Sequence, residues 1–143
     1  MMAGRAKPPR ISLTLGMKIV RVSEGKATMT MAVGSRFHNP MGTLHGGIIT
    51  DLADAAMGIA TISTLGEGEV FTTLELKMNF LRPVFSGRIT AEGTVLHRGK
   101  TIALAEVVVT DDARKMVAKG VATQMIIKTD RASGSTPRRQ HPG

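Results

Sequence analysis

The sequence lacks cysteine, tryptophan and tyrosine, and its aromatic side chains are four phenylalanines. Without cysteine the chain can have no disulfide, no thiolate nucleophile and no cysteine metal site, which excludes several classes of enzyme. With so few aromatic rings it offers little surface on which nucleic-acid bases could stack. No apolar run approaches the roughly 18 residues of a membrane-spanning helix. These absences, and the lack of an apolar segment after the basic start of the chain, predict a cytoplasmic protein without a membrane partner.

The positive charge lies mainly at the two ends of the chain. The formal net charge is +8, of which residues 1–10 and residues 128–143 each contribute +3, and the 117 residues between them carry 12 basic and 10 acidic groups. So balanced a middle segment is unsuited to binding a phosphate backbone, and we expect no nucleic-acid partner. The ends are rich in Pro, Gly, Ser and Arg and predict flexible basic termini at 1–10 and 129–143. One domain, at 11–128, remains between them.

Hydrophobic periodicity predicts one helix and several strands. Residues 11–33 hold two alternating segments around the turn sequence SEGK, which is typical of a hairpin of two strands. Residues 36–47 contain a proline and three glycines and predict a loop, whereas residues 48–65 are apolar nearly all round and predict a buried helix. Four β-rich stretches follow, at 69–81, 85–97, 101–111 and 115–127. This order predicts an α+β fold in which one antiparallel sheet of about five to six strands wraps around a central buried helix.

Two acidic residues, Asp51 and Asp54, are the charged groups of the predicted helix. Their spacing of three places them on one face. Asp51 falls in or just after the first turn, where a carboxylate complements the helix dipole. Asp54 lies about two turns in among apolar residues, so it must either be paired as a structural acid or take part in catalysis.

The loop enters the helix through His45, Gly46 and Gly47. Free backbone N–H groups and the positive end of the dipole converge there, and glycine lets another molecule approach the backbone. Such donors would stabilise an oxyanion, although a tight helix entry is the alternative explanation. Gly46 and Asp54 are eight residues apart, about 12 Å along one helix. If both act on one carbonyl group, two copies related by a two-fold axis must share the site, which predicts a homodimer.

The motif HNPMGTLHGG at 38–47, with an acid nine residues after His45, resembles the hotdog-fold thioesterases of the phenylacetate-pathway type. Further matches are the segments TLE at 73–75, NFLRP at 79–83, RGKT at 98–101 and KGVA at 119–122. The likeness covers about residues 11–128. It implies hydrolysis of acyl-CoA thioesters with aryl, phenylacetyl or medium-chain acyl groups, and a homodimer assembled as a dimer of dimers, hence a homotetramer.

The resemblance also implies roles for individual residues. Asp54 would be the general base or the nucleophile, and the Gly46 N–H would polarise the thioester carbonyl. Asn39 and His45 would flank that carbonyl, and Thr73 would help to place the acid or the water. Asp54 and Thr73 would come from one subunit and the other three residues from its partner.

Basic residues near predicted turns are candidates for holding the coenzyme A phosphates, as nearby basic residues do in similar proteins. They are Arg82, Arg98 and Lys100. The alternative is that these cations are only solvated, as exposed turn residues commonly are. No group of His, Asp and Glu has the spacing of metal ligands, so we expect no metal and no cofactor, coenzyme A being part of the substrate.

Two other functions on the same fold are alternatives. A non-catalytic acyl-CoA-binding protein could dispense with Asn39, Gly46 or Asp54, all of which are present. A dehydratase or hydratase would need an acid and a histidine over the α and β carbons of the acyl group. A histidine next to the glycine that would bind the oxyanion, as His45 is, fits that chemistry poorly.

Overall fold

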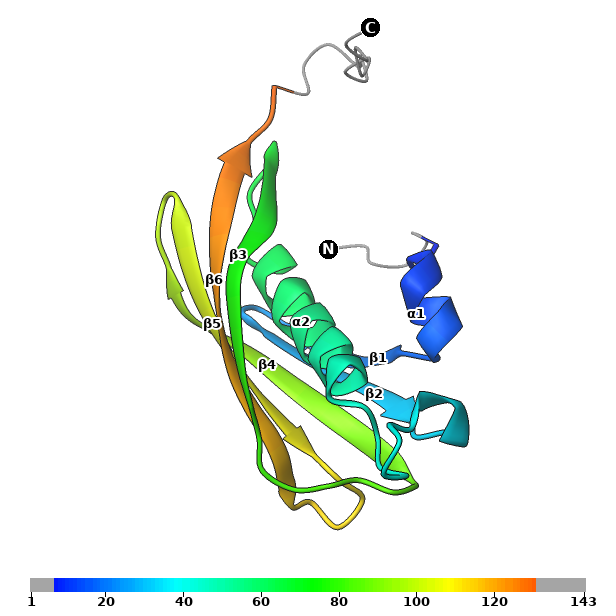
Figure 1. The fold of residues 1–143 in the computed structure, drawn as a ribbon. Helices are drawn as coiled ribbons and strands as arrows, with labels where there is room; N and C mark the ends of the chain where they lie inside the picture. Colours follow the sequence, from blue (N-terminus) through cyan, green and yellow to red (C-terminus); the bar gives the residue numbers. More distant parts are fainter. Residues whose placement is uncertain (1–6, 131–143) are drawn as a thin grey trace, which may run out of the picture.

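The structure is a computed structural model that describes residues 7–130; of the predicted termini at 1–10 and 129–143, residues 1–6 and 131–143 lie outside the described residues. Its elements are α1 (Arg10–Leu15), β1 (Lys18–Ser23), β2 (Lys26–Ala32), the short 3₁₀ helix η1 (Ser35–Phe37), α2 (Gly46–Ile62), β3 (Glu69–Phe80), β4 (Arg88–Arg98), β5 (Ile102–Thr110) and β6 (Met116–Lys128). The strands form one antiparallel sheet in the order β1-β2-β4-β5-β6-β3. Figure 1 shows this sheet curving around α2. The predicted α+β fold is confirmed, with six strands.

Helix α2 lies unusually close to the sheet because small residues line the contact. Ala53, Ala56 and Ala60 are fully buried on the helix. On β4, a Cβ added to Gly93 would lie 2.6 Å from the Ala56 carbonyl oxygen, so only glycine lets the helix backbone approach to this distance. Side chains from α2 and from the inner faces of β2, β3, β4, β5 and β6 then form one close-packed core. Within residues 7–130, none of the helices combines the length and apolar character that crossing a bilayer requires.

Helix α1 corrects the prediction that residues 11–15 belong to the first strand. The alternating apolar residues do not lie on one face of a strand, since Ser12 and Leu15, three residues apart, are the buried pair. Pro9 stands before the helix, and Gly16 ends it in a left-handed conformation with φ of 74°. The first strand starts only at Lys18, and the predicted hairpin to β2 is otherwise present.

A bulge at Leu74 changes which residues of β3 face the helix. The β3–β6 register shifts there by one residue. Because successive side chains of a strand point to opposite faces, one extra residue reverses the alternation. Phe71 and Thr73 contact α2 before the bulge, and Leu76 and Met78 pack against the core after it. Both halves of β3 therefore place side chains on the face of the sheet that contacts α2.

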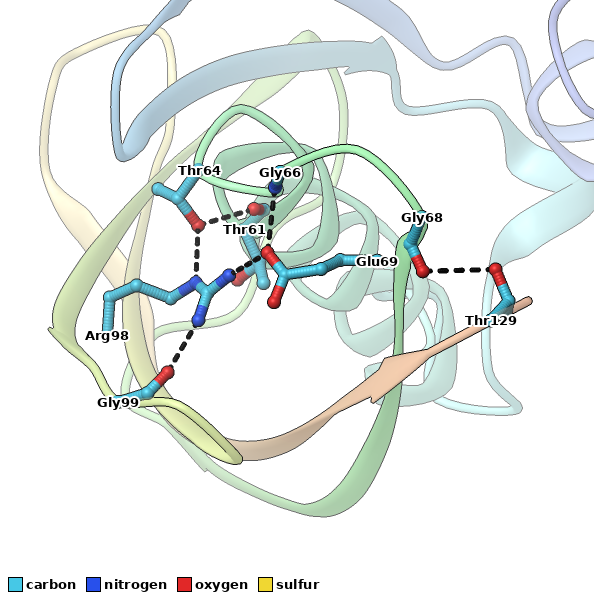
Figure 2. Close-up of polar contacts among 8 residues, drawn as sticks. All are labelled: Thr61, Thr64, Gly66, Gly68, Glu69, Arg98, Gly99 and Thr129. Carbon is cyan, nitrogen blue, oxygen red and sulfur yellow. Dashed lines mark hydrogen bonds and ion pairs between the residues drawn. The ribbon is translucent and has the colours of Figure 1, made fainter. Parts of the chain in front are cut away.

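Arg98 ties three segments together at the far end of α2 (Figure 2). Its guanidinium bonds the Glu69 carboxylate at 2.6 Å, the Thr64 hydroxyl at 3.3 Å and the Gly99 carbonyl oxygen. The Gly66 N–H donates to the same Glu69 oxygen at 2.7 Å. The cluster joins the turn after α2, the start of β3 and the end of β4.

This cluster predicts a stability that depends on pH. The Gly66 N–H bond, and then the positive charge of Arg98, hold the pKa of Glu69 below its ordinary range. A lowered folded-state pKa stabilises the fold above the unfolded pKa, and this contribution is lost as pH falls through the folded-state value. We expect Glu69→Gln to lower the melting temperature near neutral pH and to lower it much less at about pH 3. Calorimetry across this range measures it, and an equal loss at both ends would contradict the account.

Candidate active site

Asp54 lies half-buried on α2, facing β3. The Thr73 hydroxyl donates a hydrogen bond of 3.2 Å to its Oδ1. Thr73 is the last residue of β3 before the bulge at Leu74, and its side chain lies on the face of the sheet that contacts the helix. No other hydrogen bond or ion pair reaches Asp54 from residues 7–130. One carboxylate oxygen is thus oriented, and Oδ2 is available for chemistry.

The start of α2 leaves two hydrogen-bond donors for a ligand, one on the backbone of Gly46 and one on the side chain of His45. The Gly47 N–H is used in the helix cap, because it donates to His45 Nδ1 at 3.0 Å. A neutral imidazole whose Nδ1 accepts must carry its hydrogen on Nε2. The Gly46 N–H donates to no other group in the described part of the chain. The Gly46 N–H and the His45 Nε2–H can therefore both donate to a ligand at the positive end of the helix.

Phe80, at the end of β3, covers Gly46. A Cβ added to Gly46 would lie 3.2 Å from the Phe80 ring, so the absence of a side chain here leaves room for that ring. An open depression of about 340 Å³ lies beside the pair and is also lined by Asn39 and Arg82. His45 faces a second, more open depression of about 570 Å³. A ligand can approach the helix start from either side.

Asn39 shapes its own loop. Its side-chain oxygen accepts from the N–H groups of Met41 and Thr43, at 3.0 and 3.2 Å, and its Nδ2 donates to the Thr43 hydroxyl at 2.8 Å. Nδ2 carries two hydrogens, so one remains for a ligand. The structure places Asn39 and Gly46 along one depression, as the resemblance implies, but it also gives Asn39 this local role.

The three candidate phosphate ligands lie in different settings. Arg82 and Lys100 are exposed, and Arg82 lines the depression beside Gly46. Arg98 differs from the prediction, because its guanidinium is bonded to Glu69 and two further groups. It has a structural role that a turn sequence does not reveal.

Asp51 lies just after the first turn of α2. The helix begins at Gly46, two residues earlier than predicted, so Asp51 is its sixth residue and lies beyond the first turn. Partial burial, and then the negative charge of Asp54, raise the pKa of Asp51. Its surroundings therefore disfavour the charged form of this carboxyl group.

Sequence reasoning missed two features, one at the start of α2 and one beside the Asp54–Thr73 pair. One is Phe80 over Gly46. The other is a buried polar contact in which the Thr61 hydroxyl donates to the Gln124 side-chain oxygen. A signal for the second was present, because Gln124 interrupts the apolar inward-facing positions of β6. Among the described residues, no cluster of three or more His, Asp or Glu side chains could hold a metal ion.

Gly46 and Asp54 do not form one site within a single chain. Both lie on α2, separated by eight residues. At 1.5 Å and 100° per residue they are about 12 Å apart along the axis and about 80° apart around it. A carbonyl group bound at the Gly46 N–H is therefore out of reach of Asp54 from the same helix.

Comparisons with known proteins identify the family to which the chain belongs. The thioesterase superfamily model matches residues 41–118. A 1,4-dihydroxy-2-naphthoyl-CoA hydrolase from Listeria monocytogenes is 34% identical over 73% of this chain and 85% of its own length. The acyl-coenzyme A thioesterase PaaI of Escherichia coli is 33% identical over 73% of each chain. The solved structure of E. coli PaaI, from the phenylacetic acid degradation operon, superposes with a TM-score of 0.80 at 30% identity, covering 85% of this chain and 86% of that one. The chain thus belongs to the thioesterase superfamily, as a hotdog-fold thioester hydrolase of the PaaI-like type.

Proposed function

We propose that this protein hydrolyses acyl-CoA thioesters with aryl, phenylacetyl or medium-chain acyl groups to the free acid and coenzyme A, at sites shared by two subunits. Two groups on α2 carry the proposal together. Asp54 is hydrogen-bonded by Thr73 of β3, and the Gly46 N–H at the start of the helix donates to no other group in residues 7–130. A base and an oxyanion donor are what water attack on a thioester needs. The names of the two relatives support coenzyme A as the leaving group.

The free edge of β3 supports a homodimer. β3 is the last strand of the sheet, and it and the following loop expose Leu74, Phe80 and Leu81, which are 53%, 52% and 60% exposed. An unpaired edge with apolar side chains is suited to pairing with a second copy. Two β3 edges joined about a two-fold axis would set two α2 helices antiparallel, with the Gly46 end of one beside Asp54 of the other. Two such dimers would make the tetramer that the family resemblance implies.

The shared site supplies each step of the reaction. Thr73 holds Oδ1 of Asp54, and Oδ2 takes a proton from a water whose oxygen attacks the thioester carbon. The charge that develops on the carbonyl oxygen is stabilised by the Gly46 N–H and the His45 Nε2–H of the other subunit. When the tetrahedral intermediate collapses, the carbon–sulfur bond breaks and the coenzyme A thiolate takes the proton from Asp54. If Oδ2 of Asp54 instead attacked the thioester carbon directly, the coenzyme A thiolate would leave and take a proton from water. A second step, attack of water on the mixed anhydride, would then release the free acid and restore the Asp54 carboxylate.

The two helix carboxylates should differ sharply in their effect on activity. Asp54→Asn keeps the shape of the side chain and removes the base, so we expect the rate of thiol release to fall by at least about 100-fold with the fold intact. Asp51→Asn is the matched control on the same face and should lose far less. Thiol release from the best of a panel of acyl-CoA thioesters measures both variants. Equal losses, or an active Asp54→Asn protein, would reject the assignment.

Catalysis should need no metal and no added cofactor, since the proposed reaction uses only a base and hydrogen-bond donors. We expect the rate of thiol release to stay the same after dialysis against a chelator. A rate that collapses in chelator and recovers when a divalent ion is added would refute this part of the proposal.

A shared site predicts that two inactive variants restore each other. Asp54→Asn damages one half of the site and Asn39→Ala the other half. In a mixed dimer, one interface site carries both changes and the other carries none. Co-expression with two tags isolates that dimer, and we expect about half of the wild-type turnover from its single intact site. A mixed dimer as inactive as its parents would mean that each chain supplies its own complete site.

A further inference from the structure

Thr61 on α2 and Gln124 on β6 form a buried polar contact next to the Asp54 pair. Both side chains are fully buried, and the Thr61 hydroxyl donates to the Gln124 Oε1. The nitrogen of the same amide group, Nε2 of Gln124, has no hydrogen-bond partner in residues 7–130. A buried amide donor without a partner destabilises the fold, whereas an apolar side chain of similar shape would not. Packing alone therefore does not account for a glutamine at this position.

The sheet places Gln124 directly beside the catalytic pair. Gln124 on β6 is the register partner of Thr73 on β3. Both side chains point to the same helix, Thr73 to Asp54 and Gln124 to Thr61. Cβ atoms of such cross-strand partners are about 5 Å apart, within reach of a glutamine amide. Asp54 and Thr61 are seven residues apart, two turns on one helix face.

We propose that Gln124 is a positioning residue that acts through Thr73. In the single chain Nε2 makes no hydrogen bond to Thr73; the proposal is that it donates to the Thr73 Oγ1 once the site is assembled. The Thr61 hydroxyl donates to the amide oxygen, so the NH₂ group is the part of the amide that is left to bond Thr73. The proposal rests on the thioesterase function proposed above, because it explains how the base is held.

A positioned threonine matters because a hydroxyl group rotates. Its single hydrogen can bond Asp54 or turn to another acceptor, and its oxygen can accept as well as donate. With an amide donor facing the oxygen, the hydrogen remains directed at Oδ1 of Asp54. The carboxylate then keeps one orientation, with Oδ2 presented to the water. Catalysis depends steeply on such alignment, since a displacement of about 1 Å can cost about 100-fold in rate.

The test compares Gln124→Met with the wild type. Methionine has a similar length and no hydrogen-bonding group, so it removes the donor and fills the space. We expect kcat to fall by about tenfold with KM nearly unchanged, because substrate contacts are untouched. In a Thr73→Val background the same change should have no further effect on kcat, since the residue through which it acts is gone.

Thr61→Val gives a second comparison that keeps Thr73. It should lower kcat by less than Gln124→Met, and the double variant should match Gln124→Met alone. Val109→Ala, a fully buried change on β5, is the control for general loss of stability and should lower the melting temperature without changing kcat.

The outcomes separate the inference from the function on which it rests. Unchanged kcat in Gln124→Met, with equal or higher stability, would show that the glutamine only fills space and would overturn the inference. So would a loss of kcat that persists in the Thr73→Val background, or losses that add in the double variant with Thr61→Val. A wild-type protein that releases no thiol from any acyl-CoA would refute the proposed function instead.

Discussion

The contact between α2 and β4 at Gly93 is the constraint from which the site geometry follows. The helix backbone lies against the sheet there because neither Gly93 nor the alanines of α2 keep the two apart. A helix held so closely is rigid and central. Within it, the helical rise sets Gly46 at the start and Asp54 in the middle about 12 Å apart. In the proposed mechanism this separation makes each chain contribute one half to each of two sites, so that catalysis requires a dimer.

Two further features adapt this scaffold to catalysis. The bulge at Leu74 allows β3 to present Thr73 to the helix and still pack apolar side chains further along. The His45 cap uses up one N–H of the helix start and leaves that of Gly46 free. In both cases a local feature determines which polar group is available: one extra residue in the strand, and a side-chain cap at the start of the helix.

The regular elements could be predicted from the sequence because their periodicity is strong. The central helix, the four strands after it and the hairpin before it follow from apolar spacing and turn residues alone. Helix α1 could not, since its short alternating segment fits a strand equally well and only Pro9 and the left-handed Gly16 mark the difference. The glycine contact at Gly93 is invisible in one sequence because glycine has many uses.

The candidate site was predictable where a residue type was unusual for its surroundings. Asp54 in an apolar helix and the glycines before it are such cases. Arg98 was not, because a turn sequence gives no information about a partner 29 residues earlier at Glu69. Gln124 shows the same limit, since its importance depends on the strand register that sets it opposite Thr73.

The central claim is that one thioester is held by two chains. It is tested most directly by the crystal structure of the Asp54→Asn protein with a non-hydrolysable acyl-CoA analogue. We predict that the analogue's carbonyl oxygen lies about 3 Å from the Gly46 nitrogen of one subunit, with the substituted position and Thr73 of the other subunit beside the carbonyl carbon. A carbonyl group whose contacts with both positions come from the same chain would contradict the account.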